Sequence, residues 1–260
     1  MTVQNMVITG FYERLKRLPF AIHVFICIIK VSSAIGRYKP GKSKGAERMI
    51  IEIWSDFICP FCYMGKKKFE MALNEFEHKD EVEVIYRSFE LGMSAESVKG
   101  KDIHRVIADK YHISYEDARE NNDRIVKAAA EVGLHYRFDL LKLNSTMVAH
   151  EIVQYAKTKG KEKELVNRFF QGYFEEGMDI GDREALLKHA EEAGLDIADL
   201  TEQLDGQQLK AAVKKDEDMA EKLNINGVPY FLINQWYAVS GAQNPDTFLH
   251  ALQEAYESEK

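Results

Sequence analysis

Residues 50–65 read IIEIWSDFICPFCYMG, a stretch that places two thiols three positions apart where a strand gives way to a helix. The run 50–54 is short, mostly apolar and rich in β-branched side chains, which is typical of a buried strand. Pro60 suits the first position of a helix, where its missing N–H costs nothing. The helix is therefore expected to begin inside the Cys-Pro-Phe-Cys motif, with Cys59 at its N-cap. Beyond the motif, apolar or small residues recur at helical spacing, at Gly65, Phe69, Ala72, Leu73 and Phe76.

This position gives the two cysteines different chemistry. The positive end of the helix dipole favours Cys59 as thiolate, the form that attacks disulfides, whereas Cys62 lies one turn inside and is better shielded. A structural zinc site needs four ligands and Cys27 is the one other cysteine in the chain, so no metal is expected. Two buried, unreactive cysteines are the remaining alternative, but a CxxC pair at a strand-to-helix junction favours a redox site.

The composition is that of a soluble globular enzyme. The chain has 260 residues, of which 45% are hydrophobic and 30% charged, enough for one large domain or two small ones. The net charge of −7 is uneven, because residues 1–48 hold nine Lys or Arg and two Asp or Glu, while the remainder holds 26 and 40. So acidic a body is not expected to bind nucleic acid. Three cysteines leave no framework of structural disulfides.

Residues 1–48 form a basic N-terminal extension that differs from the rest of the chain and is expected to be either untranslated or unstructured. Its apolar run, 18–29, is shorter than the roughly 20 residues that span a bilayer, so no membrane span is expected. Three interpretations stay open. Translation could start at Met49, since Lys44-Gly45-Ala46 is what a purine-rich ribosome-binding sequence would encode, and this interpretation places the protein in the cytoplasm. A signal or anchor, with Ser32-Ser33-Ala34 as cleavage site, would export it, and a cytoplasmic extension is the third.

The middle of the chain predicts one more strand and then a helical block. Residues 81–89 alternate charged and apolar side chains, as in a half-exposed strand, and complete a right-handed parallel βαβ unit. From residue 101 to about 224 the pattern is helical almost without interruption. An inserted helical subdomain is therefore expected at 95–224. Its amphipathic segments are 103–111, 115–132, 164–176, 182–193, 196–204 and 207–223, with Asn144-Ser145-Thr146 as the cap of another helix.

Near the C-terminus the pattern returns to strands. Gly227-Val228-Pro229 is a turn signal, and the apolar runs 230–233 and 236–240 flank two polar residues, as in an antiparallel hairpin. A last helix is expected at 245–256. Residues 49–94 and 225–260 are thus expected to form one α/β domain around the insertion.

This order of elements resembles the thioredoxin fold in its DsbA-like form, and most of all the FrnE-type DsbA family oxidoreductases. The predicted fold class is accordingly α/β, a thioredoxin fold with a large all-helical insertion. The motifs that carry the resemblance lie between Met49 and the C-terminus. They are Ser55-Asp56-x-x-Cys59-Pro60-Phe61-Cys62-Tyr63-x-Gly65, Phe89-Glu90-Leu91, Asn144-x-x-x-Ala149-His150, Gly227-Val228-Pro229-Tyr230-Phe231 and Ser240-Gly241-Ala242-Gln243.

The resemblance implies roles for residues beyond the cysteines. It makes Val228-Pro229 a cis peptide against the thiols, which denies Cys59 an N–H partner and lets the Val228 backbone bind an extended substrate; an ordinary trans turn is the alternative. It also implies a buried carboxylate behind the resolving cysteine as proton acceptor. Glu52 would supply it, although its spacing to Cys59 is one residue longer than in DsbA, and a satisfied or edge-facing glutamate is the alternative. His150 is expected either to line the cleft or to serve packing.

The predicted reaction is thiol-disulfide exchange, in which Cys59 attacks and Cys62 resolves the mixed disulfide. The expected partners are protein or small-molecule thiols and disulfides, with no cofactor and with glutathione open as a co-substrate. The dipeptide Pro60-Phe61 lacks the histidine of strongly oxidising relatives, which implies a less oxidising couple. The sequence indicates no oligomeric state.

Two hypotheses from other classes remain beside this reaction. Related glutathione-dependent isomerases and kappa-type transferases act on small molecules, but they usually carry a serine or a single nucleophile where this chain has Cys59 and Cys62. A non-enzymatic thioredoxin-fold adaptor would instead bind peptides along the Val228 edge. The intact cysteine pair favours redox chemistry over both.

Overall fold

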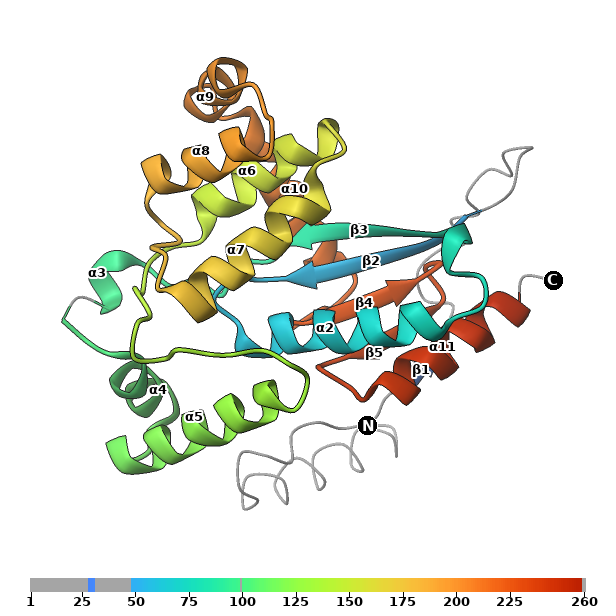
Figure 1. The fold of residues 1–260 in the computed structure, drawn as a ribbon, viewed down its shortest axis with the longest axis horizontal. Helices are drawn as coiled ribbons and strands as arrows, with labels where there is room; N and C mark the ends of the chain where they lie inside the picture. Colours follow the sequence, from blue (N-terminus) through green and yellow to red (C-terminus); the bar gives the residue numbers. More distant parts are fainter. Residues whose placement is uncertain (1–27, 31–47, 99, 259–260) are drawn as a thin grey trace, which may run out of the picture.

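The computed structural model describes residues 28–30, 48–98 and 100–258. They contain a five-stranded sheet in the order β1-β5-β4-β2-β3 (Figure 1). The central strand β2 (Met49–Ser55) runs parallel to β3 (Val82–Ser88). They are joined by helix α2 (Pro60–Glu75) and a short 3-10 helix, η2 (Lys79–Glu81). The expected parallel βαβ unit is confirmed.

The other edge of the sheet is antiparallel. Strand β4 (Tyr230–Ile233) pairs with β2 on one side and with β5 (Tyr237–Ser240) on the other, so the expected hairpin is confirmed. Helix α11 (Pro245–Glu257) follows. A short strand, β1 (Ile28–Lys30), pairs with the outer side of β5, which the sequence did not predict.

Eight helices of the described chain lie between β3 and β4, as the sequence predicts for an insertion. Aspartate and serine side chains begin several of them, because their oxygens accept the free N–H groups of the first turn; Ser114, Asp182 and Asp196 are examples. The helices are α3 (Ala95–Val98), α4 (Ile103–Tyr111), α5 (Tyr115–Ala130), α6 (Met147–Thr158), α7 (Glu162–Glu176), α8 (Arg183–Glu192), α9 (Ile197–Asp205) and α10 (Gln208–Lys222).

One part of the predicted helical block is not helical. Residues 131–146 contain no helix, and a single helical turn, α3, precedes residue 101, where the helical pattern of the sequence begins. Gly133 turns the chain with a φ of 78°, and the buried residues Leu134 and Tyr136 then alternate with exposed neighbours. Such a period of two indicates an extended segment. This short alternation is difficult to recognise in the sequence because amphipathic helices precede and follow it.

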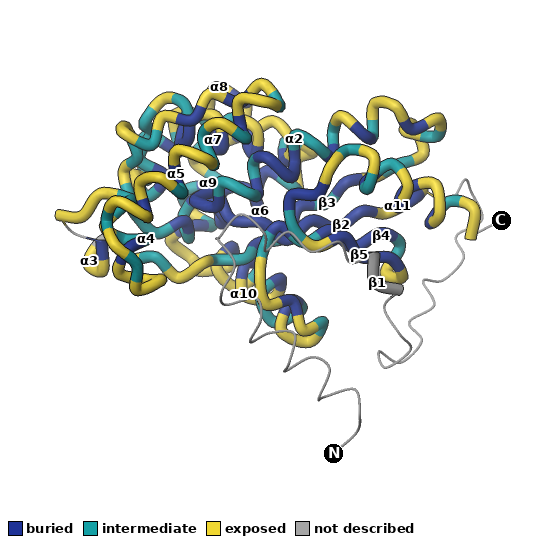
Figure 2. Tube along the Cα trace, turned by 90° about the horizontal axis from the view of Figure 1, so that it is seen from below, coloured by how far each residue is buried: buried dark blue, intermediate teal, exposed yellow. Residues whose placement is uncertain are grey.

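The two faces of the sheet have different covers. Figure 2 shows α2 and α10 on opposite sides of β2 and β3. On the α2 side, Ile51 and Ile53 of β2 pack with Phe69 in one apolar core that continues into the insertion. On the α10 side, Trp54 packs in a smaller apolar cluster, and its indole N–H donates to the carbonyl of Asp216 at 3.1 Å.

The three interpretations of residues 1–48 concern a segment that, apart from β1 and Arg48, lies outside the described residues. Within the described part, none of the helices combines the length and the hydropathy needed to cross a membrane.

Candidate active site

The two cysteines occupy the first turn of α2. Cys59 is the N-cap residue, with extended backbone angles (φ −89°, ψ 112°), and Pro60 takes the first helical position, as predicted. The Cys59 N–H donates to the carbonyl of Asp56 at 3.1 Å, and the Cys62 N–H donates to the carbonyl of Cys59 at 3.0 Å. Both side chains are unpaired thiols. Cys59 is 5% exposed and Cys62 1%, so the resolving position is the deeper one.

The surroundings of Cys62 keep it protonated. Burial raises its pKa well above the usual thiol value, and the hydrogen bond and charge of Cys59 raise it further. The Asp56 backbone and the Ser55 hydroxyl act in the opposite direction and are outweighed. Cys62 is therefore held as a protonated thiol at neutral pH.

The loop before β4 closes over Cys59. The Val228-Pro229 peptide bond is cis, and the Cys59 thiol lies 3.7 Å from the Val228 carbonyl oxygen, to which it donates. Gly65 lets this loop sit on α2, since a Cβ there would lie 2.9 Å from Pro229 Cγ and 3.4 Å from Ala242 Cα. The close approach of the loop to the cysteines thus depends on a residue without a side chain.

Tyr136 of the extended segment holds the first turn of α2 from the insertion side. Its hydroxyl donates to the Pro60 carbonyl at 2.6 Å, and its ring stacks on Phe174 with centroids 4.6 Å apart. Burial raises the pKa of Tyr136, so the hydroxyl remains a donor. Sequence reasoning missed this residue; the alternation of Leu134, Tyr136 and Phe138 was the available signal.

Glu52 does not lie where a proton acceptor for Cys62 would have to be. Its carboxylate accepts from Arg87 at 2.6 and 2.9 Å, and Arg87 also binds Asp216 at 2.9 Å. Because side chains alternate along a strand, Glu52 shares its face with Trp54 and α10, opposite to Ile53 and α2. The one-residue difference in spacing is enough to move the carboxylate to the other side of the sheet.

A buried carboxylate in the turn before Cys59 belongs to Asp56, and it lies beside the ring of His150 without a hydrogen bond between them. The Nε2 of His150, on α6, is 3.4 Å from one Asp56 oxygen, while the other oxygen accepts the Leu91 N–H at 2.6 Å. Both side chains are buried, and the His150 ring packs 4.9 Å from that of Phe57. His150 thus supports the turn before Cys59 from inside, and does not line an open cleft.

The comparisons with known proteins agree with this geometry. The family described as "DSBA-like thioredoxin domain" matches residues 50–253. The chain belongs to this family. DsbA-like proteins are disulfide oxidoreductases and isomerases, and the predicted thioredoxin fold with a helical insertion is confirmed.

Individual relatives are similar over most of the chain. The "Uncharacterized protein YwbO" of Bacillus subtilis is 31% identical over 206 residues, which cover 78% of this chain and 96% of YwbO. The crystal structure of the probable DsbA oxidoreductase SCO1869 from Streptomyces coelicolor has a TM-score of 0.76 and 37% identity, over 82% of this chain and 92% of that one. The cytosolic disulfide reductase DsbM from Pseudomonas aeruginosa, solved with GSH, shares the fold, with a TM-score of 0.57 and 15% identity over 80% and 99%.

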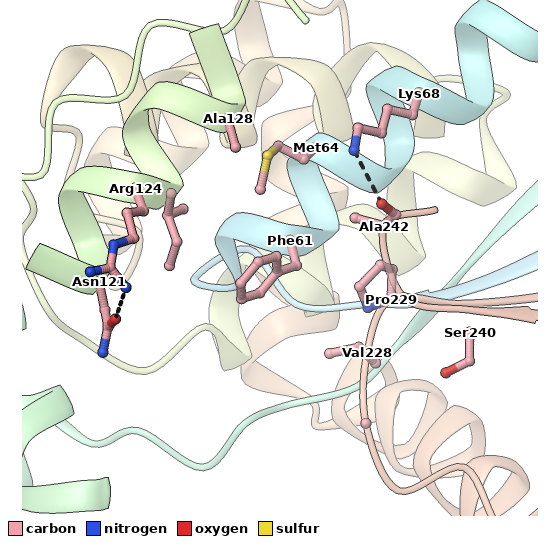
Figure 3. A pocket seen from close by; sticks show the side chains of 13 residues that line it. Phe61, Met64, Lys68, Asn121, Arg124, Ala128, Val228, Pro229, Ser240 and Ala242 are labelled. Atoms are coloured by element: carbon pink, nitrogen blue, oxygen red, sulfur yellow. Dashed lines mark hydrogen bonds between the residues drawn. The ribbon is translucent and has the colours of Figure 1, made fainter. Parts of the chain in front are cut away.

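A pocket of about 420 Å³ adjoins this DsbA-like site (Figure 3). Phe61 and Pro229 form the wall nearest to the cysteines, and α5 of the insertion closes the far side. Among the described residues, no group of three His, Cys, Asp or Glu side chains is placed to hold a metal ion. The pocket is lined by Phe61, Met64, Lys68, Asn121, Arg124, Ile125, Ala128, Gly227, Val228, Pro229, Ser240, Gly241 and Ala242.

Proposed function

We propose that this protein is a thiol-disulfide oxidoreductase that works through Cys59 and Cys62. When it reduces a substrate, the Cys59 thiolate attacks one sulfur of the substrate disulfide, and the other sulfur leaves as a thiolate. Cys62 then gives up its proton and attacks Cys59, which releases the second substrate sulfur. Two electrons pass to the substrate, and the enzyme ends with a Cys59-Cys62 disulfide. The reverse sequence oxidises substrate thiols.

The observation that carries this proposal is the asymmetry of the two thiols. Cys59 stands at the free N–H groups of a helix N-terminus, where a thiolate is stabilised, while burial raises the pKa of Cys62 one turn inside. A nucleophile and a protected resolving thiol are what exchange through a mixed disulfide requires. Two cysteines that only fill space in the core would need neither the helix N-terminus at Cys59 nor the raised pKa at Cys62.

The loop at Pro229 supports a role in substrate binding. The Val228 carbonyl already accepts from the Cys59 thiol, so backbone next to it can pair with an extended substrate in the same place. Pro60 and Phe61 separate the two thiols, and Phe61 also faces the pocket. We assign substrate contact to Val228 and Pro229 and the setting of the redox couple to the Pro60-Phe61 dipeptide.

The proposed subtype, cellular compartment and co-substrate rest on the sequence motifs and on the relatives. The motifs given above favour the FrnE type within the family. A cytoplasmic setting is supported by a chain with no framework of structural disulfides and by the cytosolic relative DsbM. No cofactor is needed for exchange. Glutathione is the proposed co-substrate, because DsbM was solved with GSH.

Single serine substitutions test the proposal. Cys59→Ser should abolish the reduction of insulin disulfides, whereas Cys62→Ser should still attack and should accumulate mixed disulfides that a reductant releases. Non-reducing gels and intact mass measurement would detect these complexes. Accumulation in Cys59→Ser instead of Cys62→Ser would reverse the two roles. Full insulin reduction by both variants would exclude the dithiol mechanism.

A further inference from the structure

The pocket beside the cysteines combines an apolar interior with two cations. Its volume of about 420 Å³ lies within the range of small-ligand sites, roughly 300 to 1,000 Å³. Phe61, Met64 and Ile125 contribute apolar surface, and Lys68 and Arg124 project from facing helices, α2 and α5 (Figure 3).

Lys68 is a half-buried ammonium group with an incomplete set of partners. Its Nζ donates to the carbonyl oxygen of Ala242 at 3.2 Å, and among the described residues no carboxylate oxygen lies within 4.0 Å of it. Burial lowers the pKa of Lys68, and the charge of Glu131 acts against this. A cation that has lost water and faces one neutral oxygen gains strongly from a carboxylate.

Arg124 places a second cation on the opposite wall, with weak contacts of its own. Its guanidinium meets Glu120 at 3.5 Å and the Asn121 side-chain oxygen at 3.4 Å, both long for hydrogen bonds. Its side chain is 55% exposed. A carboxylate that enters the pocket can therefore approach the guanidinium.

The pocket lies where the remainder of a substrate would rest. Val228 lines it, and the Cys59 thiol is 3.7 Å from the Val228 carbonyl oxygen. A disulfide in contact with Cys59 therefore has the pocket as its neighbour. A volume of about 420 Å³ suits a compact molecule better than a long peptide.

We propose that the pocket binds the carboxylate of a small disulfide or thiol substrate, with Lys68 and Arg124 as the residues that select it. This inference rests on the exchange reaction proposed above. It adds the class of substrate: compact molecules whose sulfur is linked through a short apolar stretch to a carboxylate. Neutral disulfides react at Cys59 without using either cation.

The test uses the reduced full-length protein and two probes in single turnover, dithiodipropionate, which has two carboxylates, and hydroxyethyl disulfide, which is neutral. In each turnover the enzyme's two thiols become the Cys59-Cys62 disulfide and the probe disulfide becomes two thiols. Rapid quenching and mass measurement give the rate. Lys68→Gln and Arg124→Gln should each slow the reaction with dithiodipropionate roughly tenfold more than they slow that with hydroxyethyl disulfide.

Two matched variants control for total charge. Lys67→Gln removes the same charge one residue away, where Lys67 borders a separate depression beside Glu70 and Met71. Arg119→Gln does so on α5 at an exposed position outside the pocket. Both should keep the unaltered rates with both probes.

The outcomes separate the two proposals. If the unaltered protein reduces neither probe, the exchange reaction itself is wrong. If it reduces both, but Lys68→Gln and Arg124→Gln match the unaltered protein, the pocket assignment is overturned and the exchange reaction stands. An equal loss in Lys67→Gln and Lys68→Gln would also overturn the assignment, because it would trace the effect to overall charge.

Discussion

The two faces of the central sheet bury different kinds of side chain. The face under α2 and α11 is apolar, with aromatic rings in contact; the centroids of Phe231 lie 5.5 Å from Phe69 and 4.6 Å from Phe248. The face under α10 holds ions. Arg87 bridges Glu52 and Asp216, and Asp216 also accepts from the Gln154 amide at 2.6 Å.

This difference places the reactive thiols on one face of the sheet and the ion pairs that hold the insertion on the other. The thiols lie on the apolar side, where burial raises the pKa of Cys62, and a carboxylate from the ionic side cannot reach them through the sheet. The ionic side fastens the insertion, because Gln154 on α6 and Asp216 on α10 both join the network of Arg87 on β3. Fixed ion pairs specify one docking geometry, in which the insertion then supplies Tyr136 and His150 to the active-site turn.

The largest effect should come from breaking the ionic face. Arg87→Met leaves Glu52 and Asp216 buried without their cation, and we expect the free energy of unfolding to fall by about 3 to 5 kcal/mol. Urea denaturation at neutral pH measures it. Arg137→Met is the matched control, since Arg137 pairs with Asp139 at a similar distance of 2.8 Å but on the surface, where the loss should be far smaller.

Two results would contradict the separation of the faces. Equal losses in Arg87→Met and Arg137→Met would mean that burial of the network carries no weight. Loss of Cys59 reactivity toward disulfides in Arg87→Met, under conditions where it stays folded, would mean that the ionic face serves the thiols directly.

Local patterns were sufficient to predict most of the fold. The handover from strand to helix at Cys59, the βαβ unit, the hairpin and most of the inserted helices each have a period or a cap that lies within a few residues. Three elements escaped. Strand β1 pairs with a strand far along the chain, α3 is a single turn, and the extended segment around Tyr136 has too short an alternation to stand out between two helices.

The sequence predicts the site residues that depend on a local motif. It does not predict those whose position depends on partners far along the chain. Cys59, Pro60 and Cys62 define their own turn. The proton-acceptor role of Glu52 is what the family resemblance implies, but its partner Arg87 in turn binds Asp216, 129 residues further along the chain, which no local pattern indicates. The alternation of side chains along the strand does indicate the correct face for Glu52, because a shift of one residue moves a side chain to the other face of the sheet.

A smaller effect should come from the pair where the strand ends, between the two faces. His150→Phe keeps a ring against Phe57 but removes the nitrogen that faces Asp56, which retains the Leu91 N–H. We expect unfolding to become easier by about 1 to 3 kcal/mol. Urea denaturation measures this, and His135→Phe at an exposed position is the control. Unchanged stability in His150→Phe would show that the contact with Asp56 contributes nothing.

The apolar face should reveal itself through the pH dependence of stability in the reduced protein. Burial and Cys59 raise the pKa of Cys62 above the usual 9.0, so both the folded and the unfolded chain keep this proton below pH 9. Above that pH the unfolded chain ionises and the folded one does not, so the contribution of Cys62 is lost at up to about 1.4 kcal/mol per pH unit. The comparison is with Cys62→Ala, measured from pH 8 to 10. A difference between the two proteins that stays constant over this range would contradict the burial of the thiol.

The smallest effect should come from the charge that the α2 side does bury. Lys66 is 4% exposed and its ammonium contacts Glu70 at 2.6 Å, but the Glu70 side chain is 39% exposed and keeps its water. Burial lowers the pKa of Lys66 despite this contact, so the charged form is less favourable folded than unfolded. Lys66→Met removes that cost and strands no buried carboxylate. We therefore expect the free energy of unfolding to stay within about 1 kcal/mol of the unaltered protein, on the stabilising side. Urea denaturation beside Arg87→Met tests this directly: a loss as large as that of Arg87→Met would mean that a buried cation is costly to remove whether or not its partner is buried.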